Sequence, residues 1–140
     1  MAFTGNYSCN TLRSGLVNGT INFATDTFYL ALYTNSATLD STTTAYTATG
    51  EATGGNYSPT GLPVTATISS AVVGAGSVTY VSFSSPAWTG VITARGALIY
   101  TPGADGAVCV LDFGSDKTSA NTFTVQMPAN TSTSALIRLV

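Results

Sequence analysis

The strongest run of apolar positions in this chain lies between Val91 and Phe113. This segment reads VITARGALIYTPGADGAVCVLDF, two apolar stretches separated by the dipeptides Pro102-Gly103 and Asp105-Gly106. Both dipeptides favour tight turns, because proline presets its own φ and glycine accepts a positive φ at no steric cost. The pattern therefore predicts a β-hairpin of two antiparallel strands.

Pairing about the turn predicts the register of this hairpin, with Ile99 opposite Val108, Ala97 opposite Val110, and Arg95 opposite Asp112. We expect Arg95 and Asp112 to form a cross-strand ion pair within or at the edge of an apolar face. Apart from this pair both faces of the hairpin are apolar, whereas an antiparallel sheet with one face in water alternates apolar and polar residues. We expect a second sheet of the same domain to cover one face and another subunit to cover the other.

Other short apolar stretches, separated by turn residues, predict further strands. The segment TFYLALYT, from Thr27 to Thr34, is apolar on both faces and is typical of a central strand. A weak helical pattern over residues 7–17 predicts a possible short helix. Strands at this spacing predict an all-β fold for residues 1–140, a single antiparallel β-sandwich or barrel-like domain.

Residues 35–63 form the longest stretch without a core pattern, rich in Gly and Thr with scattered Pro. A loop of this length in a small domain is either functional or an extended arm. Its large side chains are Leu39, Tyr46, Tyr57 and Leu62. Since tyrosine buries much area at little entropic cost, we expect these four residues to be contacts of an assembly arm that orders on a neighbouring subunit.

Composition narrows the choice of partners. Charged residues make up 7% of the chain, against about 25% in typical domains, so Ser and Thr must supply most of the polar surface. The net charge of −2 argues against nucleic acid, which requires a basic patch. So low a charge favours self-association and thus an assembly subunit, with a secreted β-domain as the alternative. The sequence predicts no membrane span and no export signal.

Side chains for catalysis or metal binding are scarce. The chain has no histidine and six dispersed acidic residues, and it carries none of the common catalytic or phosphate-binding motifs. Asp112 and Asp116 are the two carboxylates nearest in sequence that could serve as the catalytic pair of a glycosidase. The simpler roles are an ion pair with Arg95 for Asp112 and a solvated turn for Asp116. Cys9 and Cys109 fit neither a metal nor a redox motif; Cys109 suits a core, and a disulfide between them stays possible. We predict no enzyme activity, no cofactor and no metal.

Four segments, in this order, carry a resemblance to a known family: YLALYTNSATLD, GGNYSPTG, ITARGALIY and VCVLDFGSDKTS. Together they resemble a family of small structural proteins of tailed bacteriophage virions, over about Phe28 to Met127. The resemblance implies a virion component without enzyme activity, made in the host cytoplasm. It implies a capsid decoration or cement protein that binds between major capsid subunits, commonly as a trimer, or else a tail, neck or fibre-associated component. A secreted β-sandwich binding domain is the remaining alternative.

Overall fold

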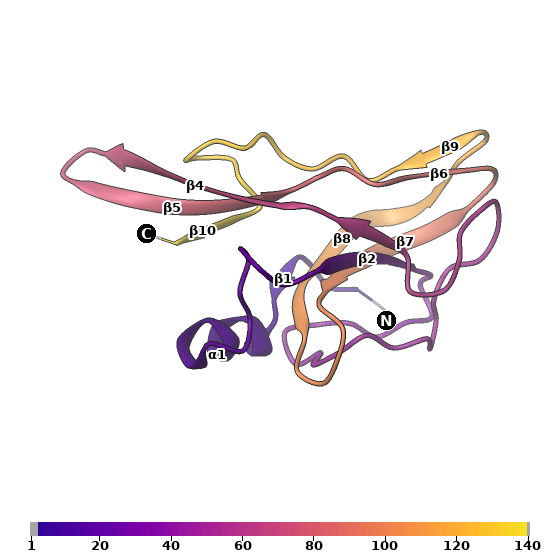
Figure 1. The fold of residues 1–140 in the computed structure, drawn as a ribbon. Helices are drawn as coiled ribbons and strands as arrows, with labels where there is room; N and C mark the ends of the chain where they lie inside the picture. Colours follow the sequence, from indigo (N-terminus) through magenta and orange to yellow (C-terminus); the bar gives the residue numbers. More distant parts are fainter. Residues whose placement is uncertain (1–2, 140) are drawn as a thin grey trace.

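The computed structural model describes residues 3–139 and shows an all-β protein with one short helix (Figure 1). The strands pair antiparallel throughout and form three sheets, ordered β1-β8-β7-β2-β3, β10-β5-β4 and β6-β9. Each of these sheets has two edge strands, so the described part of the chain forms layered sheets and no closed barrel. The elements are β1 (Tyr7–Ser8), α1 (Asn10–Asn18), β2 (Phe28–Tyr33), β3 (Leu62–Val64), β4 (Ala66–Val73), β5 (Gly76–Phe83), β6 (Ala87–Thr89), β7 (Thr93–Tyr100), β8 (Ala107–Thr118), β9 (Thr122–Thr124) and β10 (Ile137–Leu139).

The main core lies between the five-stranded sheet and the two smaller sheets (Figure 1). Strand β2 shows why: Phe28, Leu30 and Leu32 all point into this core, as alternate residues of one strand must. The smaller sheets contribute buried residues of β5, β6 and β9 to the same core, namely Val81, Phe83, Trp88 and Phe123. The sheets are therefore held face to face by apolar burial.

A second apolar cluster covers the opposite face of the five-stranded sheet. It takes the intervening residues of the same strands, such as Ala31 and Tyr33 of β2 and Leu98 of β7. The covering residues come from the chain itself, with Phe3 from the N-terminal segment and Ala37 and Leu39 from the segment after β2. Both faces are thus apolar, but the expectation that another subunit covers the second face is wrong for this sheet.

The register of the central hairpin differs from the predicted one. Next to the turn, Tyr100 pairs with Ala107, but a β-bulge at Val108 then shifts the pairs from Ile99 to Gly96 by one residue, and a second irregularity follows between Gly96 and Ala94. The observed pairs are Ile99 with Cys109, Leu98 with Val110, Ala97 with Leu111, and Gly96 with Asp112. The prediction assumed an unbroken ladder, and one inserted residue is enough to overturn it.

Boundaries elsewhere also shift. The helix begins at Asn10 and ends before Gly19, which adopts the left-handed conformation that glycine accepts. Tyr7 belongs to the short strand β1 and not to this helix. The sequence pattern predicts a short strand over residues 64–68, whereas strand β4 runs on to Val73 and pairs with β5 along its whole length. The resulting β4–β5 hairpin projects beyond the five-stranded sheet (Figure 1).

Candidate functional site

The Arg95–Asp112 ion pair is present, although the two residues are not directly opposite. Arg95 Nη2 lies 3.1 Å from Asp112 Oδ1, and Arg95 Nε donates a hydrogen bond to the same oxygen. Asp112 Oδ1 also accepts a hydrogen bond from Gly114 N at 2.8 Å. The side chains are 19% and 12% exposed. The partly shielded pair therefore links β7 to β8 where the ladder between these strands is irregular.

Residues 35–63 do not form an extended arm in this structure. The segment folds against the sheet, and Leu39 is buried there at 2% exposure. Tyr46 and Tyr57 are half-buried and pack against the second cluster and the main core, respectively. Leu62 lies in strand β3, opposite Leu30. The four proposed assembly contacts thus serve the fold of their own subunit.

Glu51 holds this segment in place, and the sequence analysis missed it. Its carboxylate accepts hydrogen bonds from the hydroxyls of Tyr46 and Tyr57 and from the backbone N–H of Thr60. The hydroxyl of Tyr57 accepts in turn from Leu32 N at 2.9 Å, which ties the segment to β2. The available signal was that Glu51 is the one glutamate of the chain and lies between two tyrosines.

These hydrogen bonds favour neutral tyrosines. Burial, and then the hydrogen bond and negative charge of Glu51, raise the pKa of Tyr46 to about 12. Burial also raises the pKa of Tyr57, with the hydrogen bond to Glu51 as the next cause. A shielded, protonated phenol beside a carboxylate is suited to holding structure, since it cannot act as a base near neutral pH.

The two cysteines are free and buried. Cys9 packs in the second cluster, whereas Cys109 packs in the main core, as expected for a small apolar residue. Burial raises the pKa of the Cys9 thiol to about 11, and burial raises the pKa of Cys109 as well. Thiols of this kind are poor nucleophiles, because the thiolate is the reactive form.

No metal or carboxylate centre is assembled by residues 3–139. Nowhere in this range do three Cys, Asp or Glu side chains gather closely enough to hold a metal ion. Asp112 is engaged by Arg95, while Asp116 is exposed and accepts a hydrogen bond from Asn35 Nδ2 at 3.1 Å. Each carboxylate thus has a structural partner of its own.

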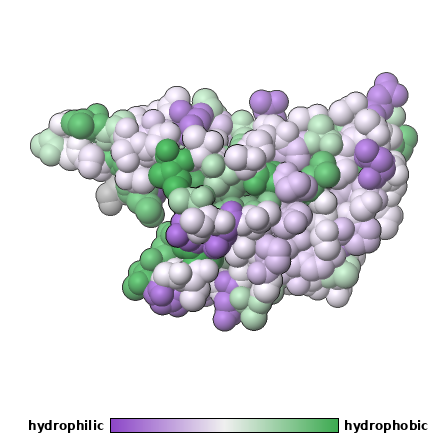
Figure 2. Space-filling view, viewed as in Figure 1, coloured by the Kyte–Doolittle hydropathy of each residue, from purple (hydrophilic) through white to green (hydrophobic). Residues whose placement is uncertain are grey.

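The β4–β5 hairpin carries the main exposed apolar surface. Figure 2 shows apolar residues along this projection and again below it, on the other side of a hollow. The large exposed apolar side chains on this sheet are Ile68 (48% exposed), Val72 (83%) and Val73 (51%) of β4, with Leu139 (50%) of β10. A grouped set of this kind marks an interaction site more often than single exposed apolar residues do.

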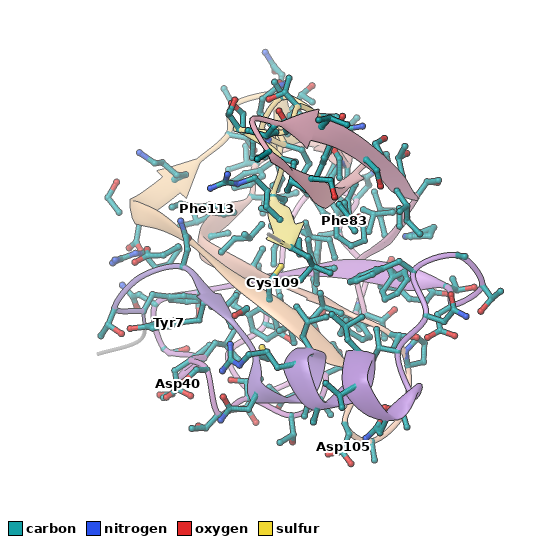
Figure 3. The ribbon with its side chains drawn as sticks, turned by 90° about the vertical axis from the view of Figure 1, so that its left-hand side faces the viewer. Tyr7, Asp40, Phe83, Asp105, Cys109 and Phe113 are labelled. Carbon is teal, nitrogen blue, oxygen red and sulfur yellow. The ribbon has the colours of Figure 1, made fainter. Side chains whose placement is uncertain are left out.

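Beneath the hairpin lies a groove of about 450 Å³, here called the notch. Its apolar walls come from α1 (Leu12 and Leu16) and from the C-terminal segment (Leu136, Ile137 and Leu139). Tyr7 and Cys109 also line it and lie between α1 and the hairpin (Figure 3). Arg13 and Arg138 bring positive charge, and no acidic residue is among the lining residues.

The fold and this surface define an all-β protein with an apolar projection and an apolar notch. Comparison with protein-family models, with curated proteins and with solved structures gives no match. Within residues 3–139, no helix is both long and apolar enough to cross a membrane.

Proposed function

We propose that this chain is a structural protein of a tailed-bacteriophage virion, acting as a capsid decoration protein. In this role it binds between major capsid subunits and stabilises the head as a homo-oligomer, with a trimer as the favoured state. It needs no cofactor and catalyses no reaction. It is made in the host cytoplasm, and its partners are protein surfaces of the particle, not nucleic acid or a membrane.

The observation that carries the proposal is the place of the phage-like segments in the fold. The segment YLALYT forms most of β2, ITARGALIY includes all of β7, and VCVLDF lies in β8. These three strands are neighbours in the five-stranded sheet. The resembling segments therefore form adjacent strands of one sheet and are not scattered over the surface. This is the distribution expected when two proteins share a fold.

The surface supports a role in protein assembly. Charged side chains are few, and the exposed apolar residues concentrate on the hairpin above the notch. Charged residues are depleted from the centres of protein interfaces, where apolar and aromatic residues are enriched. The boundary between neighbouring major capsid subunits would provide a protein surface for these apolar residues to pack against.

The number of copies per particle tests the proposal. Particles of the phage that encodes this chain would be purified, and the band of this protein would be compared with that of the major capsid protein. We expect on the order of hundreds of copies, because a decoration protein repeats with the symmetry of the shell. Tens of copies or fewer would assign the protein to the tail or neck instead, and its absence from particles would favour a secreted binding domain.

A further inference from the structure

We propose that copies of this chain bind one another by inserting the tip of the β4–β5 hairpin of one copy into the notch of the next. The inference rests on the proposed function, which calls for a homo-oligomer, and names the two surfaces that form it. The tip comprises Val72, Val73 and the turn residues Gly74 and Ala75.

The hairpin lacks the features that keep an edge strand single. Edge strands of monomeric proteins usually carry a charge, a proline or a bulge that blocks further pairing. Strand β4 carries none of these over Ala66–Val73, and its pairing with β5 is regular from end to end. No charged residue occurs anywhere between Glu51 and Arg95. A projecting, uncharged hairpin with two exposed valines at its tip is suited to burial against protein.

The pairing pattern makes the inner face of the hairpin continuous with the notch. Residues directly opposite in antiparallel strands share a face, so Ile68 points to the same side as the core residue Val81. Val72 is on this side too, and so is Leu139, through its pairing with Thr79. The underside of the hairpin therefore extends the apolar wall formed by Ile137 and Leu139.

The notch complements the tip in polarity as well. Its walls are apolar where the valines would lie, and Arg13 and Arg138 provide hydrogen-bond donors at its edge. The turn residues Gly74 and Ala75 are exposed, and their backbone carbonyls are available as acceptors. Arginine has five N–H donors, so the guanidinium of Arg13 keeps some free beside its bonds to Ser8 and Asn10.

A second copy fits this notch better than an acidic peptide, which the two arginines would also admit. An acidic peptide would leave the apolar tip in water, whereas a second copy buries the tip and the notch in one contact. Neither surface carries an acidic residue, so the contact brings no like charges together despite the net charge of −2. A tip-to-notch contact is heterologous and gives a closed ring when its rotation closes. A ring of three copies would be the expected trimer.

Sedimentation equilibrium and light scattering of the purified full chain test the contact. The variants are Val73→Asp at the tip and Leu139→Asp in the notch, with Val91→Asp as the matched control. Val91 is 60% exposed, against 51% for Val73, but lies outside the hairpin and the notch. We expect either test variant to weaken association at least ~100-fold, because a carboxylate would be buried in an apolar contact. The control should associate like the unaltered chain, and circular dichroism should show all of them folded.

Mixing the two test variants gives the sharper result. The tip of Leu139→Asp and the notch of Val73→Asp are both intact, so the mixture should form a one-to-one complex although each variant alone is monomeric. A mixture that stays monomeric, a Val73→Asp variant that associates like Val91→Asp, or an unaltered chain that is monomeric throughout would overturn the contact. A chain that is monomeric in solution would overturn the tip-to-notch contact only, and the virion role would still be tested by the number of copies per particle. Absence of the protein from particles would overturn the virion role only, and the contact would still be tested by sedimentation.

Discussion

At the scale of single residues, Gly96 explains why Arg95 and Asp112 meet off register. Asp112 lies opposite Gly96, and a Cβ on Gly96 would fall 2.4 Å from the Phe3 ring and 2.5 Å from the Leu111 carbonyl oxygen. The position opposite the carboxylate is therefore reserved for close packing of backbone and ring. Arg95 reaches Asp112 from the neighbouring irregular position, where the ladder is interrupted between Ala94 and Gly96.

The Arg95–Asp112 pair should stabilise the fold by more than an exposed pair does. Because both side chains are largely shielded, Arg95→Ala should lower the free energy of unfolding by about 1–2 kcal/mol, against under ~1 for a surface pair. Asp112→Ala should cost about 2–3 kcal/mol, since it also removes the acceptor of the Gly114 N–H. Urea unfolding measures both effects.

A double-mutant cycle separates the ion pair from the packing of each side chain. The double alanine variant should lose less than the two single losses together, because the second change no longer leaves a charge without its partner. Lys117→Ala, an exposed basic residue of β8 outside this ion pair, is the control and should change stability by less than ~0.5 kcal/mol. Losses that simply add would contradict the coupling.

At the scale of elements, the segment between β2 and β3 is a cover for the sheet rather than a free arm. Its backbone is fixed by hydrogen bonds such as Thr34 N to Gly50 O and Ala52 N to Leu32 O. Glu51 adds side-chain hydrogen bonds to the middle of the cover, at Tyr46, and to its C-terminal part, at Tyr57 and Thr60. Tyr46 and Tyr57, which the sequence predicted as interface contacts, therefore use their hydroxyls for hydrogen bonds within the subunit.

Limited proteolysis tests this reassignment. The isolated chain should resist cleavage within residues 35–60, because the cover would first have to open. Glu51→Gln should become susceptible there, since a neutral amide accepts weaker hydrogen bonds from the two tyrosine hydroxyls. Thr53→Ser, a neighbouring exposed position, is the matched control and should stay resistant. Rapid cleavage of the unaltered chain at these residues would restore the extended arm.

The sequence predicted the elements whose apolar run and flanking turn residues lie together in the chain, and it failed where distant contacts decide. Apolar runs of this kind identified β2, β7 and β8. The extension of β4 was missed, since Ser69 and Ser70 interrupt its apolar pattern and only pairing with β5 makes it a strand. Of the candidate site, the ion pair was predictable from one hairpin. The notch was not, because α1 and β10 come from opposite ends of the chain.

At the scale of the whole molecule, the scarcity of charge leaves tyrosines and cysteines to control the response to high pH. Most proteins lose many lysine charges above pH 10, but this chain has the single lysine Lys117. Burial raises the pKa of Tyr100 to about 12, and Tyr46 reaches a similar value. Burial also raises the pKa of Tyr33 and of Tyr57. The folded chain therefore keeps protons that the unfolded chain releases.

The sign of the effect follows from this difference in bound protons. An unfolded tyrosine ionises near pH ~10, so the stabilisation is complete below that pH and is lost as the pH rises towards about 12 and beyond. The cysteines lower the stability from a lower pH, because a thiol ionises from about pH 8.5 in the unfolded chain, whereas the pKa of folded Cys9 is about 11. Urea unfolding between roughly pH 8 and pH 11.5 should therefore show stability falling steadily.

Tyr57→Phe should flatten the alkaline loss of stability above pH ~10, because it removes one of the protons that the folded chain retains. At neutral pH the same variant should be less stable by about 1–2 kcal/mol, having lost the hydrogen bonds with Glu51 and Leu32 N. Tyr80→Phe removes a hydroxyl of β5 outside this network and is the matched control, with the steep alkaline loss unchanged. If Tyr57→Phe and Tyr80→Phe lost stability equally steeply, the shielded tyrosines around Glu51 would not be the groups that limit the fold at high pH.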